Sequence, residues 1–155
     1  MKFDQTDLKI IRNLQRDARI NFAEIAEECD VSIDTVIKRF NRLKKNGIVK
    51  GTTILINPRS LNYECIASFE VDVDPGELAS IIIQVREQPG IIFCTATVGM
   101  HNMFAVSIQN SMKHLSILKE NLKALPHVRD VQTSIWVDEI LLCPQNFELD
   151  RLTKR

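Results

Sequence analysis

Residues 21–49, NFAEIAEECDVSIDTVIKRFNRLKKNGIV, carry two helix-start signals close together and decide the fold of the first third of the chain. Asn21 and Glu24 have the spacing of a capping box, in which the N-cap and N3 side chains bond each other's backbone N–H groups. Ser32 is a second N-cap candidate, and Gly47 suits the residue that follows a helix end. The stretch therefore predicts a short helix, a tight turn, and a longer helix between Ser32 and Gly47.

The second of these helices is strongly basic. Every charged side chain between residues 38 and 50 is positive. A tight pair of helices whose second helix is basic is the arrangement that lets one helix enter the major groove of DNA. The pattern predicts a helix-turn-helix that binds double-stranded DNA. A solvated helix face is the plainer explanation of a charge run, and the preceding helix is what favours DNA.

The candidate DNA contacts lie on the longer helix. Four polar side chains recur there at i, i+3, i+4 and i+7, on the side predicted to lie opposite apolar Val36 and Leu43. Lys38 and Arg42 are expected to reach phosphates or base edges, and residues near the helix start to meet bases. For Arg39 a salt bridge within the domain is an equal alternative. The predicted DNA-binding residues are Ser32, Asp34, Thr35, Lys38, Arg39 and Arg42.

Charge is distributed unevenly along the chain. Its net charge is zero, yet residues 1–52 hold 11 basic and 8 acidic side chains, and residues 53–155 hold 9 and 12. Only the first segment is therefore expected to face a polyanion. No apolar run approaches the roughly 18 residues of a membrane span, and the N-terminus is too polar for a secretory signal. We expect a cytoplasmic protein with no membrane partner.

Cysteine and histidine spacing does not favour a metal site. The cysteines stand at positions 29, 65, 94 and 143, so no two form a CxxC motif, and they are expected to be small buried hydrophobes. His101, His114 and His127 share no helix at i, i+4 and are expected to be exposed. Neither a nucleophile elbow nor a phosphate-binding glycine loop occurs. The sequence predicts no metal, no cofactor and no catalytic residue.

The remainder of the first domain is predicted to complete a three-helix core. A first helix is expected from the N-cap Asp4 to about Asp17, with an apolar stripe along one side. Residues 50–63 then suggest a short strand and a hinge, where the charge character also changes. The predicted core residues are Leu8, Ile11, Leu14, Ile25, Val36, Phe40, Leu43 and Ile48.

Beyond the hinge, the spacing of apolar residues switches between the strand period of two and the helix period of 3.6. Strands are predicted at 65–73, 91–98, 103–109 and 129–141, and helices at about 78–85 and 112–125. The order β-α-β-β-α-β is that of the ferredoxin-like fold. The predicted class is α+β, a winged-helix-like helix-turn-helix domain followed by a ferredoxin-like domain. The predicted boundaries are 1–50, 51–63 for the linker, 64–142, and 143–155 for a C-terminal tail.

Two predicted strands are apolar on both faces. Strict alternation puts Ile91 and Phe93 on one side of the second strand and Ile92 and Cys94 on the other, and the last strand is apolar throughout 135–137. Helices cover only one face of a ferredoxin-like sheet, so a second apolar face needs another partner. The simplest partner is a second copy, and the pattern predicts a homodimer.

Taken together, these elements resemble the Lrp/AsnC family, the feast/famine transcriptional regulators of bacteria and archaea. The opening helix DQTDLKII with LQRDAR, the region from Ser32 to Val49, the Asn57-Pro58 hinge and the βαββαβ domain follow in the family's order over nearly the whole chain. The resemblance implies a sequence-specific DNA-binding regulator. It also implies a homodimer, often assembled into tetramers or octamers, with a small-molecule effector, usually an amino acid, bound between C-terminal domains.

The resemblance also locates the effector site, at a Gly-x-x-Asp turn that falls on residues 99–102. This chain has Asn102 for the usual acid and His101 for the usual aromatic residue. An amide offers no full charge to an ammonium group, so we expect weak or altered amino-acid binding, strengthened by Asn102→Asp. A plain hairpin turn is the alternative. The implied effector contacts are Gly99, Met100, His101, Asn102, Thr133 and Ser134.

Two rival functions share this layout. Some proteins of similar arrangement look like haem-pathway decarboxylases acting on sirohaem, in which His101 would contact substrate or donate a proton. A nucleoid-coating protein with little sequence preference would share every feature of the regulator. The uninterrupted positive charge of the second helix favours the regulator over the enzyme, because counterion release needs Lys and Arg on the phosphate-facing surface.

Overall fold

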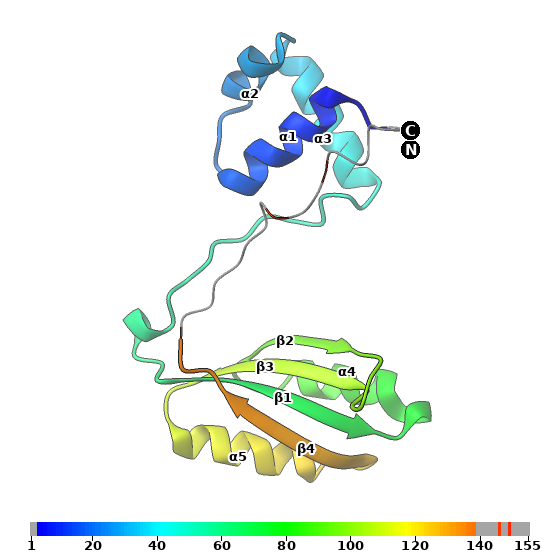
Figure 1. Cartoon of the computed structure of the whole chain (residues 1–155), viewed down its shortest axis with the longest axis vertical. Helices are drawn as coiled ribbons and strands as arrows, with labels where there is room; N and C mark the ends of the chain where they lie inside the picture. The colour runs from blue at the N-terminus through cyan, green and yellow to red at the C-terminus, as the bar shows by residue number, and fades with distance from the viewer. Residues whose placement is uncertain (1–2, 139–145, 147–148, 150–155) are drawn as a thin grey trace. The chain divides into compact units, whose positions relative to one another are not determined.

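The computed structural model describes residues 3–138, 146 and 149, and the chain divides into two compact units (Figure 1). One unit comprises residues 1–55 with 141–155, and the other comprises residues 56–140. The first contains three helices and the second a four-stranded sheet with two helices, which confirms the predicted α+β class. The finer boundaries predicted for the linker and the tail stay predictions.

The three N-terminal helices begin at polar caps. α1 (Gln5–Arg16) has a full capping box, in which Asp4 and Asp7 accept each other's backbone N–H groups. α2 (Phe22–Cys29) is capped by Asn21, whose side chain accepts from the N–H of Ala23. The N–H of Glu24 donates to the backbone carbonyl of Asn21. The predicted hydrogen bond from this N–H to the Asn21 side chain is therefore wrong.

α3 (Ile33–Lys45) is the longer helix that the sequence predicts. Ser32 caps it by accepting from the N–H of Thr35, 3.2 Å away. At the other end Gly47 has φ +70°, the left-handed conformation that suits glycine. The N–H groups of Gly47 and Ile48 bond the carbonyls of Lys44 and Leu43, which is a Schellman ending.

The helical core is close to the predicted one. Leu8, Ile25, Val36 and Leu43 are fully buried, and Phe40 is half-buried with its ring against Phe22. Ile48 was expected in this core and is exposed instead, because the reversal at the left-handed glycine turns its neighbour Val49 inward. The remaining buried members of the cluster are Ile10, Ile11, Ala26 and Leu149.

Residues 51–57 form no strand, contrary to the sequence-based prediction. They are extended and exposed, and Ile54, Leu55 and Ile56 present bare apolar side chains. Strand propensity becomes a strand only where a neighbouring strand supplies a ladder of hydrogen bonds. Within the described part of the chain no such neighbour pairs with this segment. A short 3₁₀ turn, η1 (Arg59–Leu61), follows it.

The C-terminal unit has the predicted βαββαβ order. Its sheet is antiparallel in the order β2-β3-β1-β4, which is the ferredoxin-like arrangement. The last strand ends at residue 135 rather than 141, and residues 139–141 of the predicted strand lie outside the described residues. The elements are β1 (Cys65–Val73), η2 (Pro75–Glu77), α4 (Leu78–Arg86), β2 (Ile91–Ala96), β3 (Met103–Gln109), α5 (Met112–Lys123) and β4 (Val128–Ile135).

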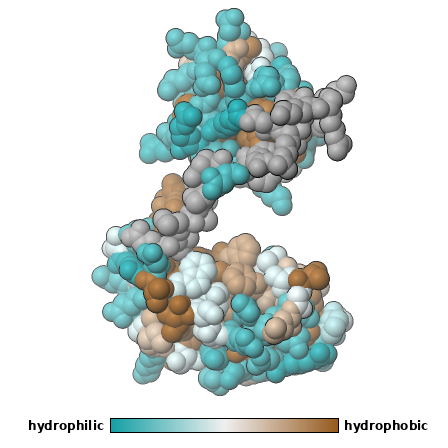
Figure 2. All heavy atoms as spheres, in the orientation of Figure 1, coloured by the Kyte–Doolittle hydropathy of each residue, from teal (hydrophilic) through white to brown (hydrophobic). Residues whose placement is uncertain are grey.

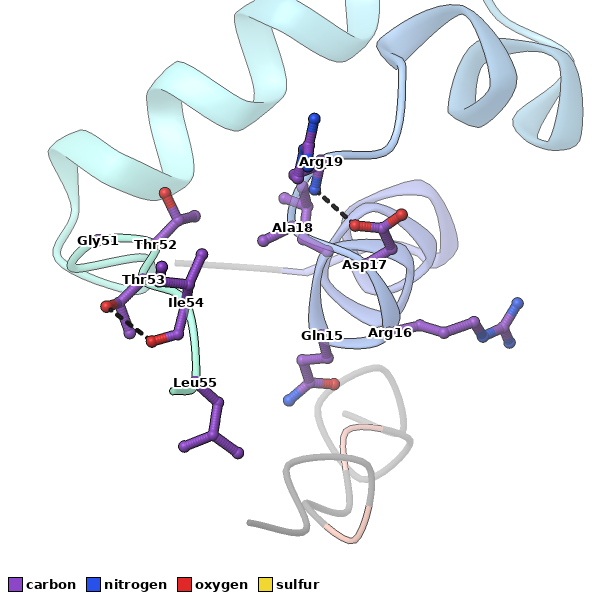
Figure 3. Close-up of a pocket in the computed structure, with 11 residues that line it drawn as sticks. Gln15, Arg16, Asp17, Ala18, Arg19, Gly51, Thr52, Thr53, Ile54 and Leu55 are labelled. Atoms are coloured by element: carbon purple, nitrogen blue, oxygen red, sulfur yellow. Dashed lines mark hydrogen bonds between the residues drawn. The ribbon is translucent and has the colours of Figure 1, made fainter. Parts of the chain in front are cut away.

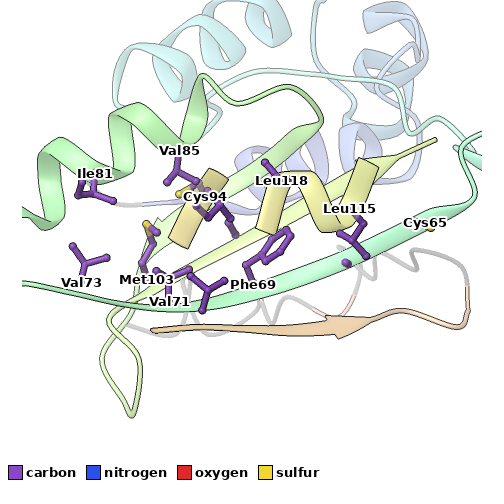
Figure 4. Packing of buried hydrophobic residues seen from close by; sticks show 14 residues of the cluster. Cys65, Phe69, Val71, Val73, Ile81, Val85, Cys94, Met103, Leu115 and Leu118 are labelled. Atoms are coloured by element: carbon purple, nitrogen blue, oxygen red, sulfur yellow. The ribbon is translucent and has the colours of Figure 1, made fainter. Parts of the chain in front are cut away.

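The core of this unit lies between one face of the sheet and the two helices (Figure 4). Phe69 and Val71 of β1 meet Ile81 of α4 and Leu118 of α5 in this layer. All four side chains are buried, as the alternating and helical patterns predict. The helices therefore leave the opposite face of the sheet to be covered in another way.

A β-bulge corrects the predicted faces of β2. The register with β3 shifts between Ile91 and Phe93, so strict alternation fails at this point. Ile91 and Cys94 pack on the helix side, whereas Ile92 and Phe93 are about half exposed. The sequence-based prediction that Ile91 and Phe93 share a face is therefore wrong. Gly90, with φ +82°, directly precedes the strand, and a Cβ added there would collide with the Ile108 carbonyl.

Candidate nucleic-acid interface and effector turn

The outward face of α3 is defined by its buried residues. Val36 and Leu43 mark the inward side, and successive residues are about 100° apart around an α-helix. The outermost line of the helix is therefore opposite these two positions. The residues closest to that line, all exposed, are Asp34, Lys38, Asn41 and Lys45. Exposed Ile37 and Arg42 lie about 70° from it, on opposite sides.

Two of the predicted DNA contacts face α1 instead. Arg42 donates from Nη2 to both carboxylate oxygens of Asp7, at 2.7 and 2.6 Å. Arg39 donates from Nη1 to Asp7 at 3.0 Å and to Asp4 at 2.5 Å. Asp7 is fully buried, so two guanidinium groups neutralise a charge that would otherwise be costly. The salt-bridge alternative for Arg39 is thus correct, and Arg42 shares it.

This ion-pair network ties α3 to the start of α1. Partial burial disfavours the charged Asp4 carboxylate, but its hydrogen bonds to Arg39 and to the N–H of Asp7 lower its pKa overall. The hydrogen bond to Asp4 raises the pKa of Arg39. The stripe predicted from the sequence lies about a quarter turn from the outermost line of the helix. The sequence already marked Val36 and Leu43 as core residues, and placing the outward face directly opposite them would have corrected the predicted stripe.

The other predicted contacts lie at the N-terminal end of α3. The hydroxyls of Ser32 and Thr35 bond each other at 2.8 Å as part of the cap. Asp34 and Lys38 form an exposed i, i+4 ion pair with a separation of 2.7 Å. Their hydrogen bond raises the pKa of Lys38. Both side chains are largely solvated, so a phosphate can replace Asp34 at small cost.

The predicted effector turn contains a small hollow. Gly99, Met100 and His101 line it together with Glu70 of β1, and its volume is about 210 Å³. The His101 side chain is only 9% exposed, contrary to the exposure expected from the sequence. Its Nδ1 lies 3.4 Å from Glu70 Oε2 and its Nε2 3.9 Å from Asp130 Oδ2. A buried imidazole between two carboxylates therefore forms one wall.

Asn102 does not line this hollow. Its amide nitrogen donates to the Val73 carbonyl at 2.6 Å, and its amide oxygen accepts from the Val73 N–H at 2.9 Å. Both halves of the amide thus clip the turn to the end of β1. An aspartate could keep only one of these bonds, so the expected gain in ligand binding from Asn102→Asp conflicts with this geometry.

The two predicted effector residues of β4 lie on opposite faces of the sheet. Thr133 pairs with Phe69 on the helix side, and its buried hydroxyl has no partner among the described residues. Ser134 pairs with Ser68 and is exposed on the other side. Neither lines the hollow beside Gly99. Glu70 was missed, because only its pairing with Phe104 in the sheet brings it to the turn. Thr97, Val98, Met103 and Phe104 were also missed, although they lie next to the turn in the sequence.

A second depression lies between the end of α1 and residues 51–55 (Figure 3). Its volume is about 760 Å³, and it is broadly open to solvent. Asp17 accepts from the N–H of Arg19 at 2.8 Å across its rim. In Figure 3 the Arg16 side chain points away from residues 51–55. Nothing in this arrangement converges on a ligand.

The sheet face opposite the helices carries a group of apolar side chains. Phe93 and Phe104 meet edge to face with centroids 6.2 Å apart, and Trp136 donates from Nε1 to Ser68 Oγ at 3.1 Å. No helix of the described chain packs on this face. Figure 2 shows hydrophobic residues at the surface of the C-terminal unit, whereas the visible surface of the N-terminal unit is mostly hydrophilic. The apolar side chains of this face are Ile66, Phe93, Phe104, Val106, Ile108 and Trp136.

The described residues contain no group of three His, Cys, Asp or Glu side chains placed to hold a metal ion, and none of their helices is long and apolar enough to cross a membrane. Cys65 and Cys94 are buried as predicted, and burial raises the pKa of the Cys94 thiol. Cys143 lies outside the described residues.

Comparisons with known proteins agree with this architecture. The winged helix-turn-helix DNA-binding family matches residues 3–50, and the Lrp/AsnC ligand binding domain family matches residues 66–144. The chain is 34% identical to the HTH-type transcriptional regulator LrpA of Pyrococcus horikoshii over 103 residues, covering 66% of this chain and 73% of LrpA.

Two solved structures share the fold over nearly their whole length. AsnC of E. coli superposes with a TM-score of 0.81 at 21% identity, covering 92% of this chain and 97% of AsnC. A transcriptional regulator of Neisseria meningitidis in complex with L-Met superposes with a TM-score of 0.79 at 26% identity, covering 91% and 94%. Since the Lrp/AsnC domain match spans half of the chain and the helix-turn-helix match precedes it, this chain belongs to the Lrp/AsnC family of transcriptional regulators.

Proposed function

We propose that the chain is a sequence-specific DNA-binding transcriptional regulator whose α3 enters the major groove. The observation that carries the proposal is the outward face of α3, where Lys38 and Lys45 lie opposite the buried residues. Exposed cations on the second helix of a helix-turn-helix are placed to release counterions from DNA phosphates. α2 ends just before α3, and the N-terminal end of α3 that follows the Ser32 cap is exposed.

Arg42 keeps a DNA role in this proposal, with Asp7 as its support. Its side chain is 45% exposed and bonds Asp7 through Nη2. The guanidinium plane has further N–H donors that can reach a phosphate while the carboxylate holds the group in place. Arg39 is less exposed and shared between two acids, so we assign it to holding α3 against α1.

The proposal includes a homodimer formed through the C-terminal units. The open sheet face with Phe93, Phe104 and Trp136 is the surface that a second copy would cover. A two-fold axis would present two copies of α3 to half-sites about 34 Å apart or a multiple of that distance. The operator would then be roughly palindromic. Assembly into tetramers or octamers is what the family resemblance adds.

We also propose a small-molecule effector at the hollow of residues 99–101. Glu70 offers a carboxylate to an ammonium group, which Asn102 cannot do while it clips β1. Peptide N–H groups of the turn can hold a carboxylate. The L-Met complex of the Neisseria meningitidis relative supports an amino-acid-like ligand. Completion of the site by another copy would explain why the hollow is open.

The test is DNA binding by the full-length protein across a range of salt concentrations. Genomic sites are first captured with the wild type, and the recovered duplex is titrated with Lys38→Ala/Arg42→Ala. We expect weaker binding and a salt slope reduced by about two, roughly one for each lost phosphate contact. Lys113→Ala, an exposed change on α5, is the control. If the salt slope of the double variant were unchanged, α3 would not be part of the DNA interface.

The same experiment separates the rival functions. A nucleoid-coating protein would retain random duplex as tightly as captured duplex at equal salt. A sirohaem-pathway enzyme would carry a tetrapyrrole absorption band and release captured DNA at low salt. We propose that the chain acts without catalysis and works in the cytoplasm, the compartment where its DNA partner lies in bacteria and archaea.

A further inference from the structure

Two aliphatic side chains stand exposed on the N-terminal half of α3. Ile33 is 49% exposed and Ile37 is 39% exposed, although both are β-branched residues that proteins usually bury. They are four residues apart, so they lie one above the other on the same side of the helix. Neither belongs to the core cluster of the N-terminal unit.

The surroundings of this pair are charged and polar. Asp34 and Lys38 flank it on one side, and Lys44 lies on the next turns of the same side of α3. Both isoleucines are within the first five residues of the helix, directly after the Ser32 cap. In helix-turn-helix proteins the residues near the start of the recognition helix are the ones that contact base edges.

We infer that Ile33 and Ile37 read the C5-methyl groups of thymine in the major groove. This inference rests on the proposed function and specifies how α3 recognises its site. Apolar side chains distinguish thymine from the other bases by contact with its methyl group, which a hydrogen bond cannot sense. The half-site would therefore contain thymines spaced to meet two side chains about 6 Å apart along the helix axis.

A second copy of the chain is the competing occupant of this apolar pair. In a two-fold interface each residue meets its own counterpart or a near neighbour. Lys38, Lys44 and Lys45 would then be brought close to the same lysines of the partner, and like charges at short range repel. DNA supplies both the methyl group and the negative charge that this face requires. Charge complementarity therefore selects the major groove.

The experiment replaces thymine by deoxyuridine, which removes only the C5-methyl group. The wild-type protein first selects a duplex from a random pool, and each thymine of that duplex is then changed singly to deoxyuridine. We expect one or two positions per half-site at which affinity falls about fourfold, the value of one buried methyl group. In Ile37→Ala or Ile33→Ala the loss at the corresponding position should vanish, while binding to the uridine duplex stays near the wild-type value.

Ile117→Ala is the matched control, because Ile117 is also 49% exposed on a helix but lies on α5. It should keep the full preference for thymine. Equal affinity of the wild type for thymine and deoxyuridine at every position would overturn the inference while leaving DNA binding intact. A change in sedimentation of Ile37→Ala with an unchanged thymine preference would show that a second copy covers the pair. Failure of the wild type to retain any duplex at low salt would overturn the proposed function itself.

Discussion

The two units solve the same problem, covering apolar surface, in different ways. The N-terminal unit buries Leu8, Ile25 and Leu43 among its own helices and turns a hydrophilic surface outward. The C-terminal unit buries one face of its sheet and leaves Phe93 half exposed on the other. A unit that closes its own core can present charge to a polyanion. A sheet with one uncovered face is suited to self-association.

Each unit also contains a polar side chain whose hydrogen bonds join distant parts of the chain, and we call these two sets of bonds polar clips. In the N-terminal unit the buried Asp7 receives Arg39 and Arg42, and in the C-terminal unit Asn102 brackets the backbone of Val73. The first clip is charged and positions the helix proposed to bind DNA. The second is neutral and shapes the turn proposed to bind an effector.

The largest effect is expected from Asp7→Ala. The change removes a fully buried acceptor of three charged hydrogen bonds and half of the α1 capping box. Charged hydrogen bonds are worth enough that we expect the unfolding free energy to fall by about 3 kcal/mol. Urea denaturation followed by helical circular dichroism measures it. Asp34→Ala, which breaks an exposed ion pair within α3, should cost under about 0.5 kcal/mol. Equal costs would refute the special role of Asp7.

The next effect concerns the uncovered sheet face. Phe93→Lys places a charge where the second copy is proposed to pack, and the lost burial of one aromatic side chain is worth about 2 kcal/mol. We therefore expect the dimer dissociation constant to rise about thirtyfold, as measured by sedimentation. Ile83→Lys changes an isoleucine that is also well exposed, on the helical side of the unit, and should leave the constant alone. If Ile83→Lys dissociated the dimer and Phe93→Lys did not, the dimer interface would lie on the helical side of the unit.

The neutral clip predicts a smaller loss. In Asn102→Asp the carboxylate can still accept from the Val73 N–H but faces the Val73 carbonyl without a donor. We expect a loss of about 1 kcal/mol in stability at neutral pH, regained on acidification when the carboxyl becomes a donor. Asn110→Asp, at an exposed position before α5, is the control for thermal unfolding across pH. If Asn102→Asp left the stability unchanged and increased the affinity for an amino acid, the prediction made from the family resemblance would be correct.

The smallest effect is acid sensitivity at the unit surfaces. The hydrogen bonds from Arg129 and His127 hold the pKa of Asp74 below its ordinary value. A lowered pKa in the folded state contributes stability above the unfolded pKa, and this contribution is lost as pH falls through the folded pKa. Wild type and Asp74→Asn should therefore differ in melting temperature near neutral pH and converge below about pH 4. A gap that persists in acid would exclude this origin.

Local structure was largely predictable from the sequence. The caps at Asp4 and Ser32, the left-handed ending at Gly47 and the order of strands and helices all followed from near neighbours along the chain. Capping bonds and apolar periodicity join residues a few positions apart, so they act wherever the rest of the chain lies. The family resemblance was carried by the same local signals, and the comparisons confirm it.

Only the tertiary structure decided how these elements present their side chains. Arg42 was expected to contact DNA, but it bonds Asp7, which is 35 residues away in the sequence. Asn102 was expected to contact an effector, but it bonds the backbone of Val73, 29 residues away. The bulge that divides Ile91 from Phe93 likewise depends on pairing with β3. Hydrogen bonds and ion pairs between distant residues form once the elements have packed, and burial then sets which polar groups must be paired. The sequence by itself determined the helices, the order of the strands in the C-terminal unit and the family, whereas packing between distant residues determined which side chains remain free to act.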